Sequence, residues 1–205
     1  MGRAEENDPM TTGEADPQPA RQSAVSIIRA EHKGFATTLH SLQRYLRPVI
    51  EHGLKPNYDL FGSILSYMDT FMDRFHHPKE DEHLFRAVRE RSDRADGVLL
   101  ELQHQHAAGP AMLRELHEAL GRTRGGSASD IEDFASRLRR YTEMQEAHMR
   151  KENDIIIPLA CETLTAADWT AIDEAFRENL DPLFGTGPRE SVGSVSGRSG
   201  SAPIP

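Results

Sequence analysis

The chain has 205 residues, with 24 Lys and Arg against 33 Asp and Glu, and a formal net charge of −9 at pH 7. This length predicts one domain with a sizeable core. The acidic balance argues against nucleic acid or an anionic membrane as a partner, because both require a cationic surface. One cysteine, no apolar run long enough to span a membrane and no signal-peptide pattern predict a soluble cytoplasmic protein. Its unusual feature is a set of 10 histidines.

Both ends of the chain lack apolar periodicity and predict disordered tails. Residues 1–22 carry prolines and acidic side chains, and residues 183–205 are rich in Gly, Ser and Pro. Such segments cannot bury enough apolar surface to offset the entropy of ordering them. We therefore expect the folded domain at residues 23–182.

Within this domain, apolar side chains recur every three or four residues, as in helices that pack on one side. The pattern predicts helices at about 23–52, 58–90, 93–121 and 130–160, and a short fifth helix at 165–178. Ser23, Asp130 and Thr165 mark helix starts, and Pro78 is expected to kink the second helix. The prediction is an all-α, up-down-up-down four-helix bundle with a short fifth C-terminal helix.

Each long helix interrupts its apolar stripe with one histidine; these are His32, His76, His106 and His148. A buried polar group without a partner costs roughly 1–3 kcal/mol, so these positions require a reason. Glu80 follows His76 by four residues and Glu152 follows His148 by four, which places each pair on one helix face. Any one of these features also fits an ordinary core histidine or a surface pair. The complete set favours a buried metal site.

Mixed nitrogen and oxygen ligands inside a bundle are typical of a carboxylate-bridged dinuclear iron or manganese centre. A structural zinc site normally uses thiolates, and the chain has a single cysteine. A single metal would leave ligands unused. We therefore expect two metal ions, either iron or manganese, with the glutamates as bridges. The predicted metal ligands are His32, His76, Glu80, His106, His148 and Glu152.

Two of the other histidines leave alternatives open. His77 precedes Asp81 by four residues and competes with His76 for the inward position, although the phase of the apolar stripe favours His76. His83 lies one turn from Glu80 and is a candidate partner of that carboxylate. The histidines expected off the stripes or at the surface are His40, His52, His104 and His117.

The segments around these residues resemble the hemerythrin-like family, also called HHE cation-binding domains. The matching segments are IRAEHKGF around His32, FHHPKEDEHLF around His76, QHAAG around His106 and HMRKENDIIIPLA around His148. The resemblance extends over roughly residues 24–180. It implies a non-haem di-iron centre in a four-helix bundle, engaging O₂, NO, peroxide or iron itself. The resemblance thus makes iron the expected metal and manganese the second choice.

Two positions depart from the oxygen-carrying hemerythrins. Their third helix has a second histidine where this chain has Pro110, and their fourth helix has a His-xxxx-Asp spacing where this chain has His148-xxx-Glu152. The metal near His106 is therefore expected to be more open or to recruit another ligand. Tyr141 is the first candidate, with an ordinary core tyrosine as the alternative. This difference argues against reversible O₂ carriage.

The leading hypothesis is a metal-binding protein that binds or senses O₂, NO, redox state or iron. The expected partner is a small diatomic or peroxide ligand. The side chains expected to form an apolar wall against water are Phe35, Met68, Met72, Phe75 and Phe134. The alternative is a di-iron catalase or peroxidase, or an NO-handling oxidoreductase, with Tyr67, Tyr141 or His83 as proton donor. The sequence assigns no catalytic residue, and a metal-free helical adaptor is the third hypothesis.

Overall fold

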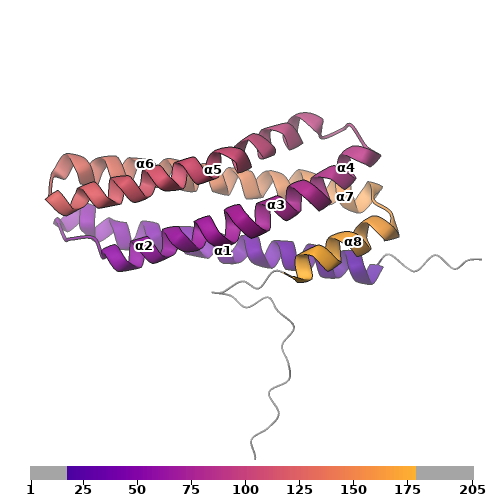
Figure 1. Ribbon diagram of the computed structural model, residues 1–205, viewed down its shortest axis with the longest axis horizontal. Coiled ribbons are helices and arrows are strands. Elements are labelled where there is room, and N and C mark those ends of the chain that lie inside the picture. Colours follow the sequence, from indigo (N-terminus) through magenta and orange to yellow (C-terminus); the bar gives the residue numbers. More distant parts are fainter. Residues whose placement is uncertain (1–17, 179–205) are drawn as a thin grey trace, which may run out of the picture.

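The computed structural model describes residues 18–178, and within this range the chain is helical with no strand (Figure 1). The first long helix is α1 (Gln18–His52), and the third is α5 (Asp96–Arg122), which ends in the 3₁₀ turn η3 (Thr123–Gly125). The second is built from α2 (Tyr58–Tyr67), η1 (Met68–His76), α3 (His77–Lys79), η2 (Glu80–Phe85) and α4 (Arg86–Arg91). The fourth comprises α6 (Ala128–Lys151), η4 (Glu152–Ile156) and α7 (Ile157–Thr163), and the fifth is α8 (Ala166–Arg177).

The four long helices lie side by side, and α8 packs along the first half of α1 at one end of the bundle (Figure 1). Within the bundle α1 contacts α2 and α6, and α5 contacts the same two helices. Lys79 Nζ donates to Ala175 O at 2.6 Å, which ties α8 to the second helix. The predicted all-α bundle with a short fifth helix is confirmed. No described helix combines the length and apolar character that a membrane crossing requires.

The helix ends agree with the expected caps in part. Thr165 caps α8 through a capping box with Asp168, as predicted, whereas α6 begins at Ala128, two residues before the expected Asp130. The prediction for α1 was wrong, because the helix begins at Gln18 rather than Ser23. Residues 18–22, expected in the N-terminal tail, are helical, and Ala20 packs on the core. The rest of both predicted tails lies outside the described residues.

The second and fourth long helices contain π-helical segments, η1, η2 and η4, in which the backbone bonds span five residues instead of four. Pro78, which lacks an amide hydrogen, lies between η1 and η2. The expected kink therefore takes the form of widened turns. These turns shift the helical phase, so that Ile156 is buried while Ile155 is exposed. Phe75 is likewise 52% exposed and cannot belong to the predicted apolar wall.

Two apolar clusters fill the interior. The distal cluster includes Phe35, Phe61, Met72, Leu113, Phe134 and Leu138. The proximal cluster, which lies against α8, includes Ile28, Leu84, Leu102, Ile156, Trp169 and Phe176. On every long helix the predicted histidine falls between a residue of one cluster and a residue of the other. The bundle therefore holds a polar layer between two dry cores.

Candidate metal centre

The polar layer consists of seven buried histidine and glutamate side chains contributed by the four long helices. They are His32, His76, His77, Glu80, His106, His148 and Glu152, none more than 8% exposed. The structure thus brings together all six residues predicted as ligands and adds His77. Their nitrogen and oxygen atoms fall into two groups that could each hold a metal ion.

The first group is formed by His32, His76 and Glu80, and Glu152 reaches it from the opposite helix. The Nε2 atoms of the two imidazoles lie 3.1 Å apart. Two nitrogens bound in adjacent positions to one metal, at the roughly 2.1 Å of a metal–imidazole bond, are separated by about 3 Å. Glu80 Oε1 lies 3.4 Å from His32 Nε2 and 3.2 Å from His76 Nε2. The donor atoms of this group therefore converge on one point.

The second group is formed by His77, Glu80, His106 and His148. The Nε2 atoms of His106 and His148 lie 3.0 Å apart, the same arrangement as in the first group. The His77 ring stacks on the His106 ring with centroids 4.2 Å apart, and its Nε2 atom has no hydrogen-bond partner. This group contains three imidazoles, whereas the first contains two.

Glu80 and Glu152 face both groups at once. Glu80 points Oε1 toward the first group and Oε2 toward His106 at 3.6 Å. Glu152 points Oε2 toward His32 at 3.3 Å and Oε1 toward His148 at 3.0 Å. All four oxygens are buried and have no hydrogen-bond partner. Buried carboxylates require compensation by charge, and a bridging position between two cations would supply it.

Outer polar side chains orient several of these imidazoles. Glu31 Oε2 accepts from His76 Nδ1 at 2.7 Å, and Gln105 Oε1 accepts from His148 Nδ1 at 2.8 Å. An oxygen that accepts from Nδ1 leaves Nε2 with its lone pair directed at the layer. Such outer partners fix the tautomer and orientation of metal-binding histidines.

Asp81 and Asp73 occupy the corresponding places in the second group. Asp81 Oδ2 lies 3.1 Å from His106 Nδ1, and Asp73 Oδ1 lies 3.1 Å from His77 Nδ1. The sequence had paired His77 with Asp81, four residues after it. The structure instead pairs His77 with Asp73, four residues before it.

The imidazoles and carboxylates of the layer shift one another's pKa values. Burial opposes the charge of His106, but Asp81, Glu152 and Glu80 raise its pKa to about 9. Burial also opposes ionisation of Glu80, yet the imidazoles of His76 and His32 hold its pKa well below its usual range. His77 behaves in the opposite way, since burial and the neighbouring His106 and His76 depress its pKa. The buried carboxylates thus favour positive charge in this layer, which a metal cation would also supply.

Comparison with known families decides the classification. Residues 23–160, more than half of the chain, match the family described as the hemerythrin HHE cation binding domain. The chain belongs to this family. No curated protein matches it at significant similarity. Membership in the hemerythrin HHE family and the buried histidine–glutamate cluster together indicate a metal-binding function.

His77 is the site residue that sequence reasoning missed. The alternatives were His76 or His77, but both are buried, each in a different group. The widened turn η1 ends at His76, directly before His77, and lets the two consecutive side chains face the interior. The available signal was Asp73, a carboxylate one helical turn before His77. His77 lies beside His106, where an additional ligand was expected.

The other candidates lie outside the centre. Tyr141 is buried in the distal cluster, where Gln145 donates to its hydroxyl at 3.2 Å. Burial and the nearby Asp73 raise the pKa of Tyr141, which opposes a tyrosinate ligand. The imidazoles within 4.0 Å of Glu80 belong to His32, His76 and His106, and His83 is not among them. His104 is exposed, as its phase predicted.

The aromatic side chains that contact the layer differ from the predicted wall. Phe85 stacks on His106 with centroids 5.5 Å apart, and Phe176 of α8 meets His76 edge-on at 5.8 Å. Of the predicted residues, Phe35, Met68, Met72 and Phe134 are buried in the distal cluster. The short fifth helix therefore closes the layer on the side of the first group.

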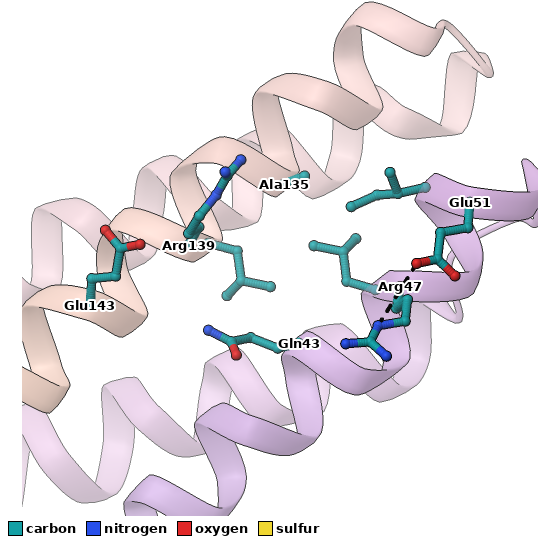
Figure 2. A pocket seen from close by; sticks show the side chains of 9 residues that line it. Gln43, Arg47, Glu51, Ala135, Arg139 and Glu143 are labelled. Atoms are coloured by element: carbon teal, nitrogen blue, oxygen red, sulfur yellow. Dashed lines mark ion pairs between the residues drawn. The ribbon is translucent and has the colours of Figure 1, made fainter.

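A groove of about 520 Å³ between α1 and α6 lies apart from this layer (Figure 2). Gln43, Arg47, Arg139 and Glu143 lie along its sides, and Arg47 pairs with Glu51 at 3.9 Å. None of its lining residues belongs to either ligand group. We assign it no part in the metal chemistry.

Proposed function

We propose that this hemerythrin HHE domain holds two non-haem iron ions and uses them to bind or sense a small ligand such as O₂, NO or peroxide. The observation that carries the proposal is the position of Glu80 and Glu152. Each directs one oxygen to the first group and the other to the second. This arrangement fits two ions bridged by both carboxylates. A site for one ion would leave the second oxygen of each carboxylate without a metal.

The donor atoms fit iron. The layer offers imidazole nitrogen and carboxylate oxygen, with no thiolate, since the single Cys161 packs against the proximal cluster. Such a donor set suits iron and manganese better than structural zinc, and imidazole favours iron over manganese. When bound, the irons supply open coordination positions and redox electrons to the small ligand.

The two positions are unequal, and this decides where the ligand binds. The first group offers His32, His76 and the two glutamates, whereas the second adds a third imidazole, His77. The metal near His106 was expected either to be more open or to recruit another ligand, and the third imidazole favours the recruited ligand. The first position has fewer protein donors, and His32 lines a surface groove of about 570 Å³, here called the His32 groove. The small ligand reaches the centre from that side.

The test is metal analysis and optical spectroscopy of the iron-reconstituted protein, before and after exposure to air, NO and peroxide. We expect about two irons per chain and a charge-transfer band that changes with the ligand. His106→Ala should lower the iron content, whereas the exposed His104→Ala should leave it unchanged. A ratio near one or zero, or equal losses in both variants, would contradict the dinuclear centre.

The alternative is an enzyme that turns over peroxide or NO, and one observation favours it. Reduction of peroxide requires protons, and Asp73 is a buried carboxyl group in contact with His77. Burial and the nearby Asp69 raise the pKa of Asp73 to about 7, so that it can give and take a proton near neutral pH. Evolution of O₂ from peroxide, measured against an equal amount of free iron, tests this. Turnover no faster than that of free iron would exclude the enzyme.

A further inference from the structure

A second surface groove, of about 490 Å³, opens next to His77 and His106 and is strongly acidic. Asp73, Asp81 and Glu82 line it, together with both histidines, and none of its lining residues is Lys or Arg. We call it the acidic groove. Its carboxylates form a gradient of depth: Glu82 is exposed, Asp81 is partly exposed, and the Asp73 side chain is only 1% exposed.

The acidic groove ends in polar atoms that lack hydrogen-bond partners. Asp73 Oδ2 and the Nε2 atom of His77 are buried without such a partner, and Asp73 Oδ1 lies 3.1 Å from His77 Nδ1. Gly109 makes room for this carboxylate, because a Cβ at that position would lie 2.8 Å from Asp73 Oδ1. A row of carboxylates leading to an unpartnered imidazole is suited to a divalent cation, which exchanges water for oxygen ligands and then for nitrogen.

The His32 groove on the other side has a different charge. Arg29, Lys33 and Arg150 line it, against Glu146 and Asp154. Positive side chains at its mouth repel a divalent cation and do not hinder a neutral diatomic molecule or peroxide. The two grooves therefore favour different molecules.

We propose that the acidic groove is the path by which ferrous ion enters the centre, so that the cation arrives at His77 and His106 while the small ligand uses the His32 groove. This inference rests on the proposed metal centre. Glu82 attracts the cation at the rim of the groove. Carboxylate oxygens of Asp81 and Asp73 then replace its water ligands, and His77 binds it. Arg89 donates to Oε1 of Gln103, which lines the acidic groove, at 2.7 Å, and its positive charge opposes entrance of the cation.

The test measures the rate of iron uptake separately from the amount bound. Metal-free protein is mixed with ferrous ion without oxygen at low ionic strength. At set times an excess of a chromogenic ferrous chelator reports the iron that has not yet been taken up. Glu82→Gln is compared with Glu90→Gln, which removes the same charge from an exposed position outside the groove.

We expect Glu82→Gln to slow uptake about three- to five-fold, Arg89→Gln to accelerate it about two-fold, and Glu90→Gln to match the unmodified protein. The differences should shrink in 1 M salt, where charges are screened within about 3 Å. All four proteins should reach two irons per chain. Equal rates in Glu82→Gln and Glu90→Gln, with two irons bound, would overturn the path alone. An unmodified protein that takes up no iron would overturn the metal centre as well.

Discussion

The two ligand groups share Glu80 and Glu152 but differ in everything around them. The first has two imidazoles, one of them held by Glu31, and adjoins a groove with basic side chains. The second has three imidazoles, carboxylate partners on two of them, and an acidic groove. The difference originates in the second long helix, which supplies one histidine to each group. In the proposed metal centre, His77 would take the place of the second third-helix histidine that oxygen-carrying hemerythrins have where this chain has Pro110.

Removing a carboxylate that both groups share should cause iron to be lost from both positions. Glu80→Ala takes a donor from each position and is expected to reduce iron from about two per chain to near zero. Its helix content, measured by circular dichroism, should persist, because both apolar clusters remain. Glu90→Ala, on the surface of α4, is the matched control. Retention of two irons by Glu80→Ala would show that it does not bridge.

Substitutions of the two adjacent histidines on the second long helix should each remove iron from a different group. His77→Ala is expected to leave about one iron per chain, because the second position loses one of its three imidazoles. His76→Ala should also leave about one iron, held in the other position, and the double variant should hold almost none. His104→Ala is the control, since that side chain is exposed. Two irons bound to His77→Ala would mean that His77 only packs against His106.

The sequence predicted the helices and the polar layer because a helical stripe depends only on which side chains are apolar. His32, His106 and both shared glutamates lie in the interior, where the period of 3.6 residues places them. The start of α1 was missed because Ala20, in the turn before Ser23, packs on the proximal cluster, which distant parts of the chain build. Caps and periodicity contain no information about such contacts.

The π-helical turns could not be predicted in the same way. Each shifts the phase by part of a turn, and this follows from one displaced backbone hydrogen bond rather than from a side-chain pattern. Pro78 indicated an irregularity but not its form. As a result Phe75 was expected inside and lies outside, whereas His77, ranked below His76, also lies inside. The errors fall where π-helical turns are found in many proteins, at the functional site.

The two neighbouring imidazoles of the second group should respond differently to pH in the metal-free protein. Burial opposes the charge of His106, but Asp81, Glu152 and Glu80 raise its pKa from 6.5 to about 9, while that of His77 is depressed. Protonated His106 therefore stabilises the fold fully below pH 6.5, and this contribution is lost as the pH rises through 9. We expect it to be on the order of 3 kcal/mol.

Urea unfolding of the chelator-treated protein between pH 6.5 and 9.5 measures this loss. His106→Ala should flatten the dependence, whereas His104→Ala should not. In iron-loaded protein the trend should reverse, because metal ligands must be deprotonated. An equally steep fall in His106→Ala would assign the dependence to other groups.

The smallest expected effect on iron affinity comes from a substitution in α5 that displaces Asp73, the carboxylate next to His77. In Gly109→Ala the new Cβ would lie 2.8 Å from Asp73 Oδ1, so the carboxylate must move away from His77 Nδ1. Loss of an outer carboxylate partner weakens metal binding about 10- to 100-fold, so the second iron should dissociate more readily while the first is retained.

The control is Gly121→Ala in the same helix, where the new Cβ meets nothing within 4 Å. It should raise the free energy of unfolding by about 0.5–1 kcal/mol, through helix propensity, without changing iron affinity. Chelator competition measures both affinities. Equal affinity in the two variants would show that Asp73 does not orient His77, and the contrast between the groups would then rest on the imidazole count alone.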